Sequence, residues 1–544
     1  MDTNLRTADR TAGALSSRRA LAAILSAVLF LLFSYAFVMN AWVGDDAYIT
    51  FRVVDNFLHG YGLRWNIVER VQAYTHPLWM ILIGAVAQFW PDFFLMPIAV
   101  SYLLCVAALF GVWWWGRSGA QRALLVALLV SSKAFIDYTS SGLENPLSYL
   151  LLVLFYVPFL REGGAGGAPG RGRLWYAWFI ASLAFVARQD SVLLFAAPLV
   201  YLTVRAWPAW RWRVVPVLLA GTSPAWAWEA FSLVYYGFLF PNTYYAKVGV
   251  SGLPPHLLTQ HGLAYLRNSF HFDAVTLVVT GAAVLAAPAA RRWRFGLGAF
   301  SILLYLAYVV SVGGDFMSGR FLTLPFLLAA LLLVERVGDR WALALVAALA
   351  LAGYNVWAER PPLKTTRNYH RWSTAKHGGI SDERGIWGAG ASLLSVGTEN
   401  PPPWGNYVDA GRKDAASTNK VVTVSETIGY YGFFAGPQQH IIDVVGLAEP
   451  LLARLRADYS PEYFWVGHIA RALPQGYYES CDKQTNLISD PAVREYCDEL
   501  CVITRGELFT RERWKLILQF NLGSKTRYRQ PYATERWPSG RGRR

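Results

Sequence analysis

ALAAILSAVLFLLFSYAFVMNAWVGDDAYITFR (20–52) joins a long apolar run directly to two adjacent carboxylates. The apolar part, residues 20–43, has about the length that spans a bilayer. It is longer than the core of a signal peptide and no small-residue cleavage site follows it, so we expect a retained anchor. Adjacent acids repel each other, and a carboxylate near hydrocarbon is costly. Asp45 and Asp46 therefore indicate a functional position at the end of this helix.

The composition is that of a membrane protein. Of the 544 residues, 54% are hydrophobic and 16% are charged, against about 25% charged residues in ordinary soluble domains. Aromatic residues make up 15% and include 23 Trp, as is typical of membrane interfaces. The net charge of +14 could indicate nucleic acid as a partner. The basic residues stand in short clusters between apolar runs, however, which is the pattern of cytoplasmic loops and argues against nucleic-acid binding.

The chain contains twelve apolar runs and is predicted to be a polytopic α-helical membrane protein. After the first run they cover 76–90, 93–115, 120–136, 146–160, 174–187, 190–206, 214–236, 270–288, 295–312, 321–335 and 341–357. The basic loops predict which segments are cytoplasmic, namely 161–173, 205–213, 291–294 and 335–340. This assignment puts Asp45, Asp46 and everything after about 358 outside. Twelve crossings would break it, so one run within 76–115 is expected to be short or re-entrant, which leaves about eleven crossings.

Four regions are expected from the change in composition along the chain. They are a cytoplasmic N-terminal segment (1–19), a transmembrane module (20–358) whose first outer loop is 44–76, a soluble domain (359–530), and a basic tail (531–544). In the soluble region VVTVSETIGYYGFF (421–434) and HIIDVVGL (440–447) are typical of buried strands with turns, which predicts a small α/β domain.

Three cysteines lie in the C-terminal region, at Cys481, Cys497 and Cys501. A Cys-x3-Cys pair without a nearby His is a weak zinc signal. In an oxidising compartment we instead expect one disulfide and one remaining thiol. Cys105 lies in an apolar run and is expected to pack in the core.

Acidic and basic side chains gather near the outer ends of the predicted helices. An outward-facing site at the bilayer surface suits a substrate with an isoprenoid tail in the lipid and a phosphorylated head in water. Four basic residues could hold a phosphodiester, namely Arg52, Arg188, Lys247 and Arg320. One acid of the pair could act as general base for an acceptor hydroxyl, while the other orders the loop or a divalent cation. The residues leave metal dependence and the stereochemical outcome open.

Seven motifs carry a resemblance to a known family. In order they are GDDAYITFR (44–52), GLRWNIVERVQAYTHPLW (62–79), SGLENPL (141–147), ARQDS (187–191), PNTYYAK (241–247), GGDFMSGRF (313–321) and IIDVVGL (441–447). A first helix followed by paired acids and a Thr-His-Pro-Leu start of the next helix resembles the GT-C class of polyprenyl-phosphate-dependent glycosyltransferases. The seven motifs together resemble, more narrowly, the terminal arabinofuranosyltransferases of the mycobacterial cell wall and their Gram-negative relatives.

The resemblance implies a GT-C fold with about eleven transmembrane helices and a C-terminal periplasmic domain in a bacterial inner membrane. It implies decaprenyl-phosphoryl arabinofuranose as donor, a glycan or glycoprotein as acceptor, and Asp45 and Asp46 as the catalytic residues. The other motif residues would bind substrate: Tyr48, Arg52, Glu69, Tyr74, His76, Glu144, Arg188, Asp190, Asn242, Tyr245, Lys247, Asp315, Arg320, Asp443 and His468. The chain departs from the family pattern at His468, because GHIAR (467–471) follows VVGLAEP (444–450) only after a gap.

Other interpretations fit parts of the same pattern. The donor could carry mannose or aminoarabinose, since residue chemistry alone does not separate a pentofuranose from a hexopyranose. A transporter or flippase would place its acids near mid-bilayer in matching halves, and a scaffold would leave the charged set unexplained. Several residues also have structural explanations: Lys247 could snorkel, Glu144 could meet a helix dipole, and Arg188 with Asp190 could seat a helix break.

Overall fold

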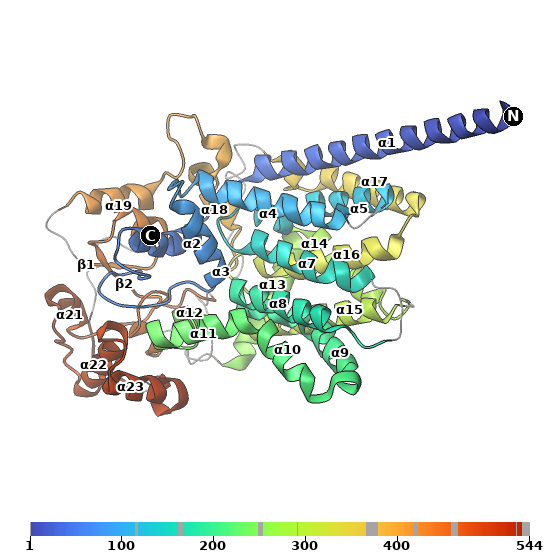
Figure 1. The fold of residues 1–544 in the computed structure, drawn as a ribbon. Helices are drawn as coiled ribbons and strands as arrows, with labels where there is room; N and C mark the ends of the chain where they lie inside the picture. Colours follow the sequence, from blue (N-terminus) through green and yellow to red (C-terminus); the bar gives the residue numbers. More distant parts are fainter. Residues whose placement is uncertain are drawn as a thin grey trace.

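Figure 1 shows the computed structural model of the chain. The structure describes residues 2–114, 118–161, 167–247, 254–290, 292–365, 379–417, 422–457, 466–528 and 530–535, and side chains from residue 20 onward except that of residue 524. Most of the chain up to residue 357 forms a helical part, from which α1 (Asp2–Asn40) projects. The C-terminal helices gather at the other end, beside α2 (Asp45–Leu58).

Every apolar run predicted from the sequence is helical. The helices are α3 (Pro77–Ala87), α4 (Leu95–Trp114), α5 (Gly119–Ser131), α7 (Asn145–Arg161), α8 (Arg171–Ala187), α9 (Leu193–Trp210), α10 (Val214–Gly221), α11 (Ser223–Tyr235), α14 (Ala274–Leu285), α15 (Trp293–Ser311), α16 (Thr323–Val337) and α17 (Trp341–Trp357). The run 214–236 is divided at Thr222, because Pro224 lies at the start of α11 and lacks the N–H that a continuous helix needs.

Among the described residues four helices are long and apolar enough to cross a membrane on their own. They are Ala20–Asn40, Leu95–Trp114, Gln189–Gly221 and Trp293–Ser311. A fifth candidate consists of α13 (Pro255–Phe272) and α14, which bend by 112° between them. Helix α3 has only 11 residues, which agrees with a short run within 76–115. The chain is thus a membrane protein with several apolar helices, and the count of about eleven crossings stays a prediction.

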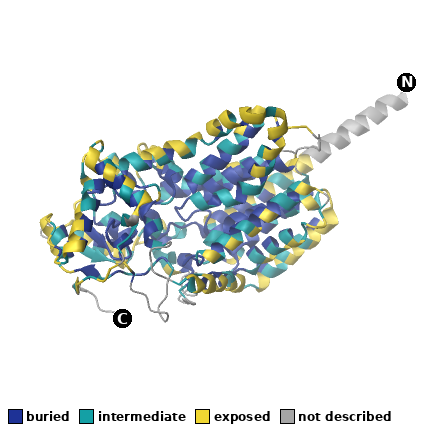
Figure 2. Ribbon diagram, turned by 90° about the horizontal axis from the view of Figure 1, so that it is seen from below, coloured by how far each residue is buried: buried dark blue, intermediate teal, exposed yellow. Residues whose placement is uncertain are grey.

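Helix α16 forms the centre of the helical part. It contacts α5, α7, α14 and α15, and eleven of its residues are buried. Figure 2 shows this buried interior continuing into the C-terminal part, with exposed residues at the periphery. A helix that is apolar on nearly all sides is stable only where other helices surround it. The interior position of α16 therefore follows from its sequence, TLPFLLAALLLV.

The C-terminal region contains two small sheets. Strand β1 (Val422–Ser425) pairs in parallel with β2 (His440–Asp443), with Val422 opposite His440. Strand β3 (Leu473–Pro474) pairs antiparallel with β4 (Thr534–Glu535). The helices of this region are α18 (Glu383–Ala391), α19 (Asn406–Ala415), α20 (Tyr430–Phe434), α21 (Tyr477–Lys483), α22 (Pro491–Arg505) and α23 (Arg511–Leu522). Parallel strands connected through a helix agree with the predicted α/β character, and the boundaries at 359 and 530 stay predictions.

Two expectations for this region differ from the structure. The stretch 421–434 is a strand only at Val422–Ser425 and then becomes α20. The chain turns at Gly429, where a Cβ would lie 2.0 Å from the carbonyl oxygen of Asp45, so only glycine fits against α2. The expected disulfide is also not found, since all four cysteines are free thiols. Cys497 and Cys501 are held on consecutive turns of α22.

Candidate active site

Helix α2 places the paired acids at its first turn. Gly44 is the N-cap, and Asp45 and Asp46 follow at the positive end of the helix dipole, where carboxylates are favourable. Asp45 is 7% exposed, and its Oδ1 accepts a hydrogen bond of 2.7 Å from the backbone N–H of Tyr430. Burial raises the pKa of Asp45 to about 7, with a further contribution from the charge of Asp46. Asp46 is more exposed than its neighbour and has the freer carboxylate.

Three of the predicted residues meet around a fourth, the buried carboxylate of Glu144. Glu144 is 1% exposed. Nδ1 of His76 lies 3.0 Å from its Oε2, Nη1 of Arg188 lies 3.4 Å from its Oε1, and Nη2 of Arg320 lies 3.3 Å from its Oε1. Burial raises the pKa of Glu144, but the charges of Arg320, His76 and Arg188 outweigh it and hold that pKa well below the usual range. We call His76, Glu144, Arg188 and Arg320 the Glu144 cluster.

Two further acids lie around this cluster. Nε and Nη2 of Arg188 donate to the two carboxylate oxygens of Asp190 at 2.7 and 2.9 Å. Nη1 of Arg320 lies 3.7 Å from Oδ2 of Asp315. The Arg188–Asp190 pair that the sequence suggested as a helix seat is therefore present, and Arg188 also reaches Glu144.

The Glu144 cluster is joined to α2 from two sides. Nε2 of His76 is 2.8 Å from Oγ1 of Thr50, a residue of α2. The negative charge of Asp46 contributes to raising the pKa of Arg320. Motifs that are far apart in the sequence thus meet at one place, on the side of α2 that carries its N-terminal acids.

The loop GGDFMSGRF needs its glycines to deliver Asp315 and Arg320. Gly314 has a φ of +69°, and a Cβ there would lie 2.6 Å from the Tyr265 side chain. Gly319 has a φ of +76°, and its Cβ would lie 2.6 Å from that of Ala134. Positive φ costs little only for glycine. The tight loop expected from the sequence is therefore present.

Helix α18 connects the motif GDDAYITFR, which carries Asp45 and Asp46, to the motif GGDFMSGRF, which carries Asp315. This connection was not predicted from the sequence. Before the helix, Ser381 donates its N–H to the carbonyl of Phe316 at 2.7 Å. At its end, Val43 donates to the carbonyl of Ala391 at 3.1 Å. Phe316 directly follows Asp315, and Val43 lies two residues before Asp45. Helix α18 is therefore hydrogen-bonded next to both groups of acids.

The first residue of α18, Glu383, is a site candidate that sequence reasoning missed. Its Oε2 accepts from Nε1 of Trp387 at 2.8 Å, and the Trp387 ring packs against Tyr430, 5.3 Å between centroids. Burial raises the pKa of Glu383 to about 8, and the charges of Asp46, Asp45 and Asp315 add to this effect. The signal in the sequence was SDERGIW (381–387), in which Asp382 accepts from the N–H of Gly385 as a helix N-cap.

Lys247 and His468 lie beside the Asp315 loop. Nζ of Lys247 is 5.7 Å from the ring centre of Phe316, and the His468 ring is 4.2 Å from the same ring. Both residues thus border the site through Phe316, and Lys247 lies on α12 (Asn242–Lys247). The gap between the motif of β2 and GHIAR does not remove His468 from this neighbourhood.

Arg52 has a structural role, because its guanidinium is fully engaged by backbone carbonyls. Its Nε donates to the carbonyl of Trp65 and its Nη2 to that of Gln439, both at 2.8 Å, and its Nη1 donates to the carbonyl of Gly432. A buried guanidinium satisfied by backbone carbonyls joins two segments of chain. Arg52 therefore ties α2 to the C-terminal region and does not face the Glu144 cluster.

Asn242 and Asp443 also make structural contacts. Nδ2 of Asn242 donates to the carbonyls of Gly446 and Glu449 at 2.8 and 3.0 Å. The carboxylate of Asp443 accepts from the N–H groups of Val445 and Ala448 at 3.0 and 2.8 Å. These bonds shape the turn after β2, which explains why IIDVVGL is a recognisable motif.

The four remaining predicted residues make contacts with other parts of the chain, although the Tyr74 ring also lies 6.5 Å from that of His76. Oε2 of Glu69 lies 3.1 Å from Nη2 of Arg505, and the Tyr74 hydroxyl hydrogen-bonds with that of Tyr236. The Tyr245 ring packs against the Arg454 guanidinium, and the Tyr48 ring contacts those of Tyr430, Phe433 and Phe434. Each of them joins the first loop or α12 to later parts of the chain. Among the described residues no group of three or more His, Cys, Asp or Glu side chains is arranged to hold a metal ion.

Two known proteins are similar in sequence to this chain, and both are terminal arabinofuranosyltransferases. No family profile matches the chain. A terminal β-(1→2)-arabinofuranosyltransferase from Corynebacterium glutamicum is 30% identical over 393 residues, 64% of this chain and 55% of that protein. One from Mycobacterium tuberculosis is 26% identical over 450 residues, 71% of this chain and 68% of that protein. The resemblance to terminal arabinofuranosyltransferases is confirmed. The chain spans little more than half the length of the first of these relatives.

Two solved structures are similar to this chain over part of its length. They are ArnT from Cupriavidus metallidurans in the apo state, with a TM-score of 0.44 and 16% identity, and the same protein bound to undecaprenyl phosphate, with a TM-score of 0.42 and 15% identity. Each comparison covers 79% of this chain and 77% of the other.

Proposed function

We propose that this protein is a membrane glycosyltransferase that moves arabinofuranose from a polyprenyl-phosphate donor to a glycan or glycoprotein acceptor. The observation that carries the proposal is the Glu144 cluster beside the acids of α2, because it combines cations for a phosphate with a carboxylate for a proton. The two arabinofuranosyltransferase relatives support the choice of sugar. We infer from the basic loops that the site faces the periplasm of a bacterial inner membrane.

Asp46 is the general base of the proposed reaction. The acceptor oxygen forms a bond to the anomeric carbon, the bond from that carbon to the phosphate oxygen breaks, and the acceptor proton passes to the carboxylate of Asp46. Its greater exposure supports this role. Asp45 holds Tyr430 through the backbone and so fixes the position of its neighbour.

Arg320 holds the departing phosphate. Its Nη2 lies at Glu144, but its Nε donates no hydrogen bond to any residue that the structure describes. A guanidinium that is largely enclosed and has an unused N–H group is suited to a phosphate oxygen. The ion pairs with Glu144 and Asp315 hold the Arg320 side chain in the position that we assign to phosphate binding. Arg188, which also contacts Glu144, adds a second positive charge nearby.

A transfer assay with the purified protein tests the proposal. The protein in detergent is offered polyprenyl-phosphoryl arabinofuranose or polyprenyl-phosphoryl mannose together with an oligosaccharide acceptor, and polyprenyl phosphate release is measured. We expect release from the arabinose donor only. Release from the mannose donor would keep the class and change the sugar. If neither donor releases polyprenyl phosphate in detergent, donor movement across the membrane of vesicles that contain the reconstituted protein would favour a transporter.

The matched control for this assay is Asp55→Asn. Asp55 is another aspartate of α2, but it is partly exposed and pairs with His59, one turn further along the helix. The Asp55→Asn variant should release polyprenyl phosphate at the wild-type rate, whereas the Asp46→Asn variant should not release it. Equal activity of the two variants would remove Asp46 from the mechanism without removing the activity itself.

A further inference from the structure

Tyr138 lies at the end of a short helix that packs against two elements of the proposed active site. This helix is α6 (Lys133–Asp137), and Tyr138 is its C-cap. Helix α6 contacts the 3-10 turn that begins at Arg320. On another side, Nζ of Lys133 lies 3.2 Å from Oδ1 of Asp382, the N-cap of α18. Tyr138 is therefore held between the turn that carries Arg320 and the start of α18.

Three charged side chains of the site act on the Tyr138 hydroxyl. They are Asp315, Glu383 and Arg320, whose charges all affect the pKa of Tyr138. Tyr138 is 2% exposed. Burial raises the pKa of Tyr138 well above its ordinary value, and the two carboxylates raise it further against the effect of Arg320. The phenol therefore keeps its proton at neutral pH and is available as a hydrogen-bond donor.

The hydroxyl of Tyr138 is not used by the fold. It forms no hydrogen bond with any residue that the structure describes. The hydroxyl of Tyr265, by contrast, donates to the carbonyl of Met317 at 3.0 Å and accepts from the N–H of Phe321 at 3.1 Å. Unlike the hydroxyl of Tyr149, which is enclosed and unpaired, that of Tyr138 is not sealed from solvent. Since buried hydroxyls are normally hydrogen-bonded, an unused and accessible one is suited to a bound ligand.

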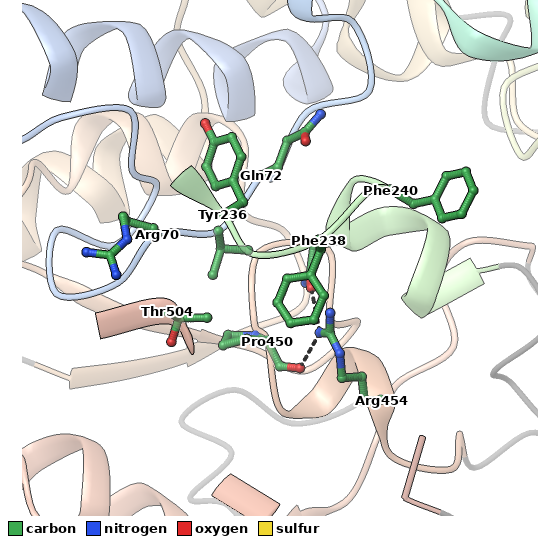
Figure 3. Close-up of a pocket in the computed structure, with 10 residues that line it drawn as sticks. Arg70, Gln72, Tyr236, Phe238, Phe240, Pro450, Arg454 and Thr504 are labelled. Carbon is green, nitrogen blue, oxygen red and sulfur yellow. Dashed lines mark hydrogen bonds between the residues drawn. The ribbon is translucent and has the colours of Figure 1, made fainter. Parts of the chain in front are cut away.

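The cavity shown in Figure 3 lies at a different place. It measures about 10 Å³ and lies where the first loop, the chain between α11 and α12, and the C-terminal region meet. It has room for about one water molecule, so the phosphorylated head of a donor does not fit there. No residue of the Glu144 cluster lines it. We therefore place the donor phosphate by the charges around Tyr138 and Arg320.

We propose that Tyr138 is a further catalytic residue, whose hydroxyl donates a hydrogen bond to the phosphate oxygen that leaves the anomeric carbon. This role rests on the proposed function, in which Arg320 holds the same phosphate. When the bond from the anomeric carbon to this oxygen breaks, the electron pair stays on the oxygen and the phosphate gains a second negative charge. A hydrogen bond to that oxygen becomes stronger as the charge develops, which lowers the barrier. The phenol keeps its proton, and the acceptor proton still passes to Asp46.

Tyr138→Phe tests the proposal because it removes only the hydroxyl. The purified variant in detergent is offered polyprenyl-phosphoryl arabinofuranose and an oligosaccharide acceptor, and single-turnover release of polyprenyl phosphate is measured. We expect the rate to fall by about 100-fold, the usual effect of losing one donor to a developing negative charge. The dissociation constant of the donor should change much less, because its phosphodiester has not yet gained the second charge. A rate equal to that of the wild type would overturn the role of Tyr138.

Binding of polyprenyl phosphate separates this role from a structural one. The product carries the added charge, so Tyr138→Phe should bind it about tenfold more weakly than the wild type does. The thermal midpoint should stay at the wild-type value, because the hydroxyl makes no hydrogen bond within the described fold. A lowered midpoint with equal losses in donor and product affinity would indicate a structural role and contradict the proposal.

Tyr156→Phe is the matched control. Tyr156 is 0% exposed, and its hydroxyl donates to the carbonyl of Leu194 at 2.5 Å. It lies about three turns along α7 from Asn145. The control loses a hydrogen bond of the fold and should still release polyprenyl phosphate at the wild-type rate. Equal rates for the two variants would contradict the proposal, whereas a wild-type protein that releases none would overturn the proposed function and the role of Tyr138 with it.

Discussion

At the scale of single residues, adjacent identical side chains have different environments. Asp45 accepts a backbone hydrogen bond and is buried, whereas Asp46 is more exposed and faces the charge of Arg320. Asp46→Asn should lower kcat by about 100- to 10,000-fold, the usual contribution of a general base. Asp45→Asn should cost about tenfold at most, because an amide oxygen still accepts from Tyr430. Single-turnover release of polyprenyl phosphate measures both values, and equal losses would contradict separate roles.

We expect Glu383 to make the activity and the stability of the protein depend on pH. Its pKa of about 8 lies above its ordinary value of 4.5. The folded state therefore binds an extra proton between these values, and the stability that this proton provides is lost as the pH rises through about 8. Above that pH Glu383 is ionised, and its negative charge beside Asp46 should weaken binding of the anionic donor. Glu383→Gln should keep activity above pH 8 and flatten the loss of the thermal midpoint. A pH profile equal to that of the wild type would exclude this role.

At the scale of elements, the loop that carries Arg320 depends on Gly319. Gly319→Ala places a Cβ 2.6 Å from that of Ala134 at a positive φ, which costs about 1 to 3 kcal/mol. The loop is expected to move, so that Arg320 no longer aims at the donor phosphate. Equilibrium binding of the donor should weaken more than the single-turnover rate of bound donor falls. Gly338→Ala is the control, since that glycine also has a positive φ but no neighbour within 4 Å.

Sequence reasoning predicted the elements better than their contacts. Apolar runs become helices because a long apolar stretch has few other stable structures in a membrane. GDDAYITFR and GGDFMSGRF were predicted to contribute to one site, and the structure brings them close enough for the charge of Asp46 to act on Arg320. The role of Arg52 could not be predicted, because carbonyls of Gly432 and Gln439 satisfy it and a carbonyl leaves no signature in the sequence. Glu383 was missed for a related reason: the α18 bridge depends on backbone hydrogen bonds between distant segments.

At the scale of the whole molecule, the site lies at one end of the helical part. Figure 1 shows α2 at the same end as the C-terminal helices. The basic loops should lie on the other side of the membrane. The topology therefore predicts that the C-terminal region and the active site share the periplasmic side, where a lipid-linked donor and an extracellular glycan can meet.

Substituted cysteines can test this topology with a membrane-impermeant maleimide. Cys105, Cys481 and Cys497 are buried, so a Cys501→Ser background should have little labelling of its own. Asn400→Cys, an exposed position between α18 and α19, should react in intact spheroplasts. Arg171→Cys, exposed at the start of α8, should react only after the membrane is permeabilised. The reverse pattern would place the acids of α2 in the cytoplasm, and labelling of both positions in intact cells would mean that the basic loop 161–173 is not cytoplasmic.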